Sequence, residues 1–176
     1  MNNALDVLFN RKSTRQYTGK PVSVEDLTTL IRAGMAAPCS RGQKCWYFIA
    51  VNDQAVIAKL AAGLPYAQMI LSAKHAIVVL ADLNLAHGGA EVPYWIQDLS
   101  AAAENILIAA EARGLGACWT GVHPRPERVE FLCQALDLPP QVMPLCVIAI
   151  GQSAGVEKAR DKFDPTRIFW NHWKQK

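Results

Sequence analysis

Residues 98–113 read DLSAAAENILIAAEAR, with apolar side chains on almost every face of a helix. The pattern predicts a helix that ends before Gly114, because glycine commonly follows the last helical turn. A helix without a polar face must be covered on all sides. That cover comes either from a central place in the protein's own core or from a second subunit, and the sequence leaves both alternatives open.

Short apolar runs before and after this helix predict buried strands. Residues 46–51, 76–81 and 145–150 are rich in β-branched or aromatic side chains, and residues 117–120 form a weaker fourth run. The first 40 residues predict helices instead. Residues 3–9 fit a short helix, and a second helix up to Ala36 follows an N-cap at Ser23.

Length and composition restrict the class of protein. The chain has 176 residues, 51% of them hydrophobic, so we expect one domain with a sizeable core. A formal charge of +3, from 18 basic and 15 acidic residues, is too small and too scattered to indicate nucleic acid as a partner. No apolar run approaches the roughly 20 residues of a membrane span, and the first ten residues do not resemble a signal peptide. We therefore expect a cytoplasmic protein.

The five cysteines and four histidines do not form a recognisable reactive or metal-binding motif. The cysteines form no Cys-x-x-Cys pair and no histidine spacing typical of zinc, so we expect neither disulfides nor a metal site. His75, His123 and His172 lack the neighbours of a catalytic triad and are interpreted as structural. Gly114 and Gly116 lack the third glycine of a dinucleotide-binding loop, so we interpret them as a helix end and a tight turn.

The C-terminal segment is crowded with large apolar side chains. Its members are Phe163, Ile168, Phe169, Trp170 and Trp173. Left exposed, such a segment would favour aggregation, whereas large apolar patches on globular proteins usually mark interfaces. The composition predicts an arm that wraps either the protein's own domain or a partner, and we favour the partner.

Residues 11–15 read RKSTR, which places three cations and two hydroxyls side by side. Guanidinium forks, ammonium groups and hydroxyl donors together hold a phosphate well, because charge-assisted hydrogen bonds are short and strong. Taken alone, the cluster also fits a solvated basic turn after a helix. Motifs elsewhere in the chain are needed to choose between a phosphate-binding site and a solvated turn.

Four motifs, in this order, resemble the nitroreductase-like family of FMN-dependent oxidoreductases over nearly the whole chain. They are residues 11–15, residues 36–49, residues 105–119 and residues 138–151. The resemblance implies an α+β fold with a mixed, mainly antiparallel central sheet flanked by helices. It also implies one FMN-binding domain over residues 1–176 and an obligate homodimer, with two FMN sites at the subunit interface and a C-terminal arm that reaches the partner subunit.

The resemblance further implies which residues hold FMN. The residues that match the family's binding positions for the phosphate and the ribityl chain are Arg11, Lys12, Ser13 and Arg15. The resemblance implies that Arg160 and Lys162 contact the same phosphate. Those matching a loop that approaches the isoalloxazine from the partner subunit are Pro38, Cys39 and Ser40. Those whose backbone matches the segment near the ring and phosphate are Cys118, Trp119, Thr120 and Gly121.

One motif departs from the family. Where the family commonly has Asn-x-Gln-Pro-Trp, residues 42–46 read GQKCW, so only Trp46 is retained. The cation of Lys44 would favour a reduced, anionic flavin if it lies near the ring, but it fits a solvated loop residue equally well. Cys45 in place of proline loosens the turn before the strand. Cys39 is interpreted as a small loop residue, although its implied place is near a redox cofactor.

The activity implied by the resemblance is an NAD(P)H-dependent, ping-pong oxidoreductase. Hydride would pass through flavin N5 to an electron-poor acceptor such as a nitroaromatic or a quinone, and no catalytic side chain is needed because the cofactor performs the chemistry. Two alternatives stay open. One is a flavin reductase, ene-reductase or reductive dehalogenase of the same fold, and the other is a non-enzymatic homodimeric module that binds a phosphate ligand. The sequence selects neither NADH nor NADPH.

Overall fold

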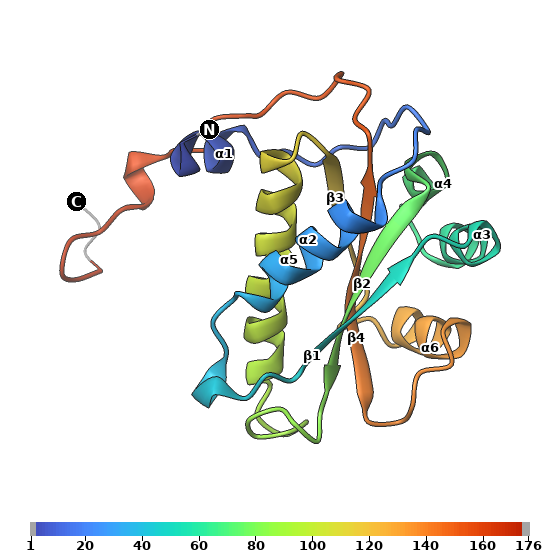
Figure 1. Ribbon diagram of the computed structural model, residues 1–176. Coiled ribbons are helices and arrows are strands. Elements are labelled where there is room, and N and C mark those ends of the chain that lie inside the picture. The colour runs from blue at the N-terminus through green and yellow to red at the C-terminus, as the bar shows by residue number, and fades with distance from the viewer. Residues whose placement is uncertain (1–2, 174–176) are drawn as a thin grey trace.

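A computed structural model describes residues 3–173 as a four-stranded sheet between two layers of helices (Figure 1). The strands are β1 (Trp46–Val51), β2 (His75–Asp82), β3 (Gly116–Gly121) and β4 (Val142–Gly151). The α-helices are α1 (Ala4–Asn10), α2 (Val24–Met35), α3 (Gln54–Gly63), α4 (Met69–Ala73), α5 (Tyr94–Ala112) and α6 (Pro126–Ala135). Short 3₁₀ turns, η1 and η2, cover Ser40–Gly42 and Pro165–Arg167.

The sheet has the order β1-β2-β4-β3, and every neighbouring pair is antiparallel. A single parallel bridge joins Ser13 to Ala117 at the β3 edge. The predicted α+β class with a mainly antiparallel sheet is therefore confirmed. All four predicted strands are present, each within a few residues of its expected bounds.

β2 shows why these apolar runs become central strands. Its alternate residues Ile77, Val79 and Ala81 face the core beneath α2 and α5, whereas Ala76, Val78 and Leu80 face the core beneath α3, α4 and α6. A strand buried on both faces has to be apolar at every position. This requirement accounts for its continuous run of valine, isoleucine and alanine.

The predicted helix α2 is confirmed. Its predicted N-cap is confirmed as well, because the Ser23 hydroxyl accepts a hydrogen bond from the Asp26 amide at 3.0 Å. α3, α4 and α6 were not predicted from the sequence. Asp53 caps α3 by accepting from the amides of Ala55 and Val56, and Pro126 opens α6 at a position where its missing N–H costs nothing. Both signals are present in the sequence.

α5 has a buried stripe and a partly covered outer face. Leu99, Ala103 and Ile106 are fully buried against α2 and the sheet, whereas Ala101 and Ala109 are half-buried. Most of α5 is therefore buried by the protein's own core, as one of the two alternatives expects. Its outer face remains partly exposed. Among the described residues, none of the helices is long and apolar enough to cross a bilayer.

The segment of residues 155–173, here called the C-terminal arm, leaves the end of β4 and runs past α1 and away from the sheet (Figure 1). Phe163, Trp170 and Trp173 are 72%, 84% and 78% exposed. The alternative in which the arm wraps its own domain is therefore wrong for these side chains.

We expect the free energy of unfolding to fall as pH rises above 9. Burial raises the pKa of Tyr17, Cys146 and Cys118 above their ordinary values, and that of Cys45 from 9.0 to about 11. In the unfolded chain these groups lose protons near their ordinary values, so the stabilisation is complete below about pH 9 and is lost as pH rises through the folded values. Urea unfolding at pH 8, 9 and 10.5 measures the effect.

The control for this experiment is Tyr17→Phe. Its hydroxyl donates a 2.6 Å hydrogen bond to the Thr14 carbonyl, so the variant loses some stability at every pH. Its pH dependence should nevertheless be flatter than that of the unsubstituted protein. A free energy of unfolding that stays constant or increases from pH 8 to 10.5 would contradict the argument.

Candidate functional site

The predicted phosphate-binding residues surround one cavity of about 570 Å³, here called the basic pocket. It is lined by Arg11, Lys12, Ser13, Arg15, Val156, Glu157, Lys158, Arg160 and Lys162. The sequence-predicted pair of clusters, some 150 residues apart, is therefore brought together by the fold. Six of the lining side chains are cations and one is a carboxylate, so the pocket favours an anion.

The N-terminal segment is fixed on the β3 edge of the sheet. Thr14 is buried, and its amide donates to the Ala117 carbonyl at 2.9 Å. A Cβ at Gly116 would lie 2.6 Å from the Thr14 methyl group, so only glycine allows this close approach. The backbone on both sides of Ser13 is thus held in place beneath the pocket.

Glu157 ties the C-terminal arm to the same segment. Its Oε1 accepts hydrogen bonds from the Arg15 amide at 2.7 Å and the Gln16 amide at 3.0 Å. A carboxylate that accepts two amide protons satisfies both donors with charge-assisted bonds. The contact holds the two walls of the basic pocket together.

Two of the predicted phosphate ligands already have carboxylate partners on α5. Arg11 Nε lies 3.0 Å from Glu104 Oε1, and Lys12 Nζ lies 3.0 Å from both Glu111 carboxylate oxygens. Lys12 therefore forms an ion pair that connects the N-terminal segment to α5. Among residues 3–173, Arg11 is paired through its Nε, and its terminal guanidinium nitrogens have no partner there. After these two pairs and Glu157, the basic pocket keeps an excess of three positive charges.

A second cavity, of about 150 Å³ and here called the small pocket, adjoins the basic pocket through Arg15, which lines both. It is lined by Arg15, Pro65, Tyr66, Met69, Cys118, Trp119, Thr120, Gly121 and Arg128. All four predicted residues of β3 are thus present here. The two cavities form an elongated site, with many cations at one end and the end of β3 at the other.

Three buried side-chain atoms lack a hydrogen-bond partner among the described residues, and all three belong to residues that line these pockets. They are Glu157 Oε2 in the basic pocket, and Thr120 Oγ1 and Arg128 Nε in the small pocket. Buried polar atoms are nearly always paired in native proteins, because an unpaired one costs free energy. The three atoms therefore mark places beside the two pockets where buried polar groups are left unpaired.

The predicted loop residues Pro38, Cys39 and Ser40 are not brought to either pocket within one chain. The Ser40 amide donates to Asp98 at 2.9 Å, which places the loop near the start of α5, whereas Glu111 marks the basic pocket near the end of α5. The 13 positions from Asp98 to Glu111 span about 20 Å of helix. Within one chain, the loop therefore lies away from both pockets.

The departure from the family pattern at Lys44 and Cys45 has a structural outcome. Cys45 is fully buried, with Sγ 4.0 Å from Asp98 Oδ2, and its carbonyl accepts from the Asp82 amide at 2.8 Å. The carbonyl contact extends the β1–β2 pairing, and the thiol packs in the core. Lys44 is exposed.

Sequence reasoning missed Glu157, Lys158 and Arg128. Glu157 and Lys158 lie just before the predicted Arg160, so a wider window there would have found them. Arg128 gave no signal of its own, because its role depends on α6 packing beside the end of β3. Within residues 3–173, no group of three or more His, Cys, Asp or Glu side chains is placed to hold a metal ion.

Comparison with known proteins assigns the family. The sequence model of the Nitroreductase family matches residues 8–64 and 60–152, which together make up most of the chain. This chain belongs to the nitroreductase family. The match includes the N-terminal cations of the basic pocket and the β3 side of the small pocket, whereas the C-terminal arm lies beyond it.

Three relatives illustrate the nitroreductase likeness. A protein of Archaeoglobus fulgidus, named "Putative NADH dehydrogenase/NAD(P)H nitroreductase", is 36% identical over 98% of this chain and 100% of its own. A crystal structure from Parabacteroides distasonis with the same name is 43% identical and superposes with a TM-score of 0.92, covering 98% of this chain and 100% of its own. A nitroreductase structure from Desulfovibrio desulfuricans "in complex with FMN" is 29% identical, with a TM-score of 0.79 and coverage of 94% and 93%.

Proposed function

We propose that this nitroreductase-family protein is an FMN-dependent NAD(P)H oxidoreductase that acts as a homodimer. The proposal is supported by family membership, by the FMN complex of the Desulfovibrio desulfuricans relative, and by relatives named for NADH or NADPH. The observation that carries it is the basic pocket, where cations from residues 11–15 and from residues 158–162 meet, next to the small pocket that shares Arg15. FMN has matching chemistry, with a phosphate, a hydroxylated chain and a ring that bears carbonyl groups.

The chain's own residues fit this cofactor from end to end. Ser13, Arg160 and Lys162 would hold the phosphate, with the free guanidinium nitrogens of Arg11. Arg15 spans the two pockets, and the backbone of residues 118–121 would border the ring.

The cofactor supplies the chemistry when bound, accepting hydride from NAD(P)H and passing it to an electron-poor acceptor. The protein's part is to position the reactants and to set the charge around the ring. The described residues around the pockets include no histidine, which is compatible with this division of roles.

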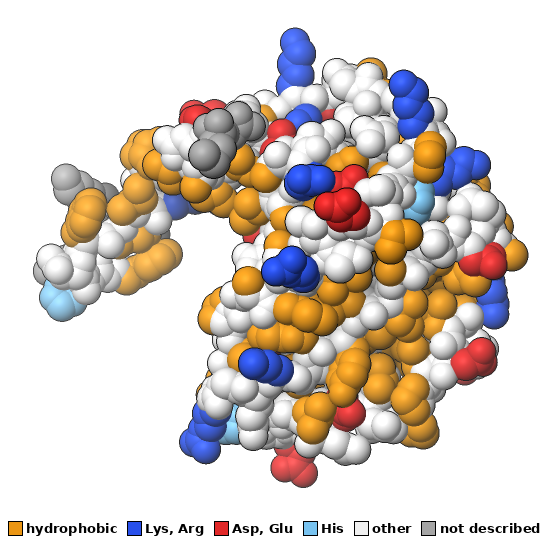
Figure 2. Space-filling model, in the orientation of Figure 1, with side chains coloured by type: hydrophobic (Ala, Val, Ile, Leu, Met, Phe, Trp, Pro, Cys, Tyr) orange, Lys and Arg blue, Asp and Glu red, His pale blue; other side chains and the backbone are white. Residues whose placement is uncertain are grey.

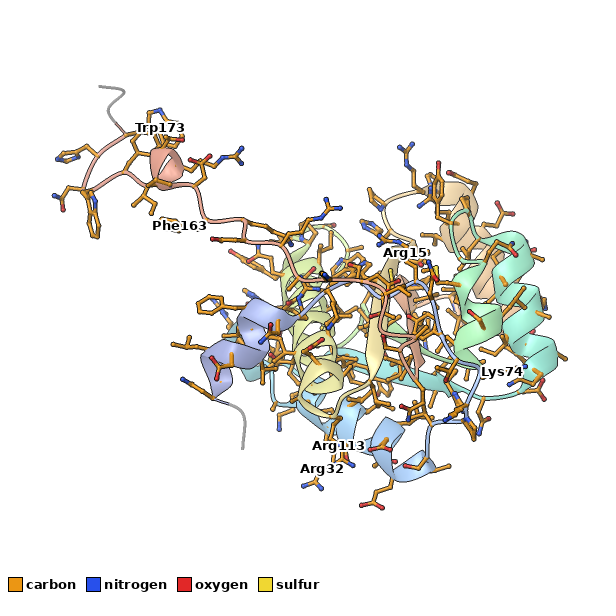
Figure 3. All side chains as sticks on the ribbon, turned by 90° about the horizontal axis from the view of Figure 1, so that it is seen from above. Arg15, Arg32, Lys74, Arg113, Phe163 and Trp173 are labelled. Carbon is orange, nitrogen blue, oxygen red and sulfur yellow. The ribbon has the colours of Figure 1, made fainter. Side chains whose placement is uncertain are left out.

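The exposed apolar surface supports the dimer. Leu5, Leu8 and Phe9 of α1 are exposed beside the C-terminal arm, whose aromatic residues are exposed as well. Figure 2 shows the arm standing off the body with a hollow between them, and Figure 3 places Phe163 and Trp173 along the arm, beyond α1. A second copy seated in this hollow would cover the arm, α1 and the outer face of α5, and could bring its Pro38–Ser40 loop to the pockets.

We expect the double variant Phe163→Ser, Trp170→Ser to dissociate into monomers. Both side chains are more than 70% exposed in one chain, so their loss removes apolar burial from the interface and costs the folded chain little. Light scattering coupled to size exclusion measures the mass. Leu71→Ser, which is 44% exposed on α4 and does not line either pocket, is the control. A dimeric double variant would contradict this role of the arm.

The proposed activity is tested by anaerobic reduction. The flavin-loaded protein is mixed with NADH or NADPH, and then with a nitroaromatic, a quinone, free FMN, an activated alkene or a halogenated aromatic in separate reactions. Loss of the oxidised-flavin absorption with a donor, and its return with an acceptor, would support the proposal and identify the acceptor class. A protein that binds FMN but accepts electrons from neither nucleotide would contradict it.

A further inference from the structure

Ser40 and His87 form a side-chain hydrogen bond that the proposed function does not use. Ser40 Oγ lies 2.9 Å from His87 Nδ1. Ser40 ends the predicted cofactor loop and begins the turn η1, whereas His87 lies in the connector between β2 and α5. Both side chains are half-buried. The contact therefore joins two segments that are 47 residues apart, and it stays partly open to solvent.

The first turns of α5 hold each member of this pair in place. The Ser40 amide donates to Asp98 Oδ1 at 2.9 Å, and Asp98 is only 6% exposed. The His87 ring stacks on Tyr94, with ring centroids 5.1 Å apart and planes inclined by 15°. Tyr94 and Asp98 lie about one helical turn apart on α5. Neither anchor uses the Ser40 hydroxyl or a ring nitrogen of His87, so both groups can exchange protons.

Three segments contribute the ionisable side chains around the pair. They are Tyr94 and Asp98 on α5, Cys39, Arg41, Lys44 and Cys45 before β1, and Asp82 and Glu91 beside the connector. Arg41, Lys44 and Glu91 are exposed, so water and salt screen their charges. The buried charge is that of Asp98, which accepts from the Ser40 amide. Histidine is the side chain that ordinarily changes charge near neutral pH, so His87 is the member suited to supply a proton.

We propose that Ser40 and His87 deliver the second proton that the electron acceptor needs. This inference rests on the proposed function, in which the loop of one copy reaches the pockets of the other. An acceptor such as a quinone receives two electrons and one proton as hydride, which leaves an oxyanion. The Ser40 hydroxyl proton then passes to that oxygen, while the Nδ1 proton of the His87 imidazolium moves to Ser40 Oγ. The neutral imidazole regains a proton from water, so no further reactant is needed.

The test compares His87→Asn with the unsubstituted protein at saturating FMN. Stopped flow measures two rates, the reduction of the flavin by NAD(P)H and its reoxidation by a quinone. Asparagine can still hydrogen-bond to Ser40 but cannot act as an acid, so a merely structural role predicts no change. The relay predicts an unchanged reduction rate and a reoxidation rate about a hundredfold lower. Between pH 6 and pH 9, reoxidation should slow in the unsubstituted protein as His87 loses its proton, and the dependence should be flatter in His87→Asn.

A second readout does not need the cofactor. Long-range proton–nitrogen NMR of the protein without FMN reports which ring nitrogen of His87 carries the proton and whether Nδ1 is hydrogen-bonded. A ring that has given up its Nδ1 proton keeps the proton on Nε2, so we expect this tautomer in the neutral state. The Nδ1 resonance should change in Ser40→Ala, because the hydroxyl partner is removed. A neutral ring protonated on Nδ1, or an unchanged resonance in Ser40→Ala, would overturn the relay.

His123→Asn is the matched control, since His123 is also half-buried, packs edge-on against Trp95 and does not line either pocket. It should change neither rate. If the protein binds FMN and turns over but His87→Asn reoxidises at the normal rate, the inference is wrong and the proposed function stands. If the unsubstituted protein fails to bind FMN or to accept electrons from NAD(P)H, the proposed function itself fails. Should His87→Asn not fold, Ser40→Ala gives the same comparison, because it removes the hydroxyl that passes the proton on.

Discussion

Arg15→Ala is expected to purify without flavin. Arg15 is exposed and is the residue that lines both pockets, so its guanidinium is placed to contact the cofactor between the phosphate and the ring. The backbone bond from its amide to Glu157 survives the substitution, so the fold should be retained. Losing one or two charge-assisted hydrogen bonds should weaken FMN binding roughly tenfold to a hundredfold or more. Fluorescence titration of the apoprotein measures the dissociation constant.

Arg32→Ala is the control for Arg15→Ala. Arg32 is exposed on α2 and does not line either pocket. Figure 3 shows it beside Arg113 and away from Arg15. Arg32→Ala removes the same charge as Arg15→Ala. An effect on FMN binding that both variants show would therefore come from the change in net charge alone. The stronger test is Arg11→Ala combined with Arg15→Ala. If this double variant retains flavin as tightly as the protein without substitutions, the assignment of the basic pocket to phosphate is wrong.

Gly151→Ala is expected to cost about 3 kcal/mol of folding free energy, at the upper end of what added methyl groups cost in packed cores. Gly151 ends β4 opposite Gly116. A Cβ there would lie 2.8 Å from Tyr17 Cδ1 and 2.9 Å from both Cα and O of Ala73. The Ala73 atoms belong to the backbone, so the clash is not relieved by a side-chain rotation. Urea unfolding at pH 7 measures the loss.

Gly121→Ala, compared in the absence of FMN, is the control for this packing argument. Gly121 also ends a strand, but a Cβ there would meet no atom within 4 Å. Its stability should stay within about 0.5 kcal/mol of that of the parent protein. Equal losses in the two variants would show that strand propensity, and not the contact with Ala73, sets the cost.

The fold could be predicted to the extent that burial is visible in the pattern of side chains. β2 and β4 are buried on both faces and appear as unbroken apolar runs, and α5 appears as a helix with little polar surface. α3 and α6 were not predicted, because each buries only a narrow stripe. α6 has a single fully buried side chain, Leu132, so its periodicity is weak.

The candidate site could be predicted where its residues are neighbours in sequence. The cations of residues 11–15, with Arg160 and Lys162, form one cavity as expected. The pairing of Lys12 with Glu111 and the exposure of Arg128 to the small pocket depend on which helix packs beside which strand, and no local pattern encodes that. The loop at Pro38–Ser40 lies away from the site within one chain, so the assignment of these residues to the cofactor stays a prediction.

The most direct measurement is the absorption spectrum of freshly purified protein, followed by an FMN titration if the protein is colourless. The account predicts oxidised-flavin bands, or saturable binding of FMN at one molecule per chain, with bands that bleach when NADH or NADPH is added. A protein that neither carries nor binds FMN would contradict the account. The two pockets would then belong to a module that binds some other phosphate ligand.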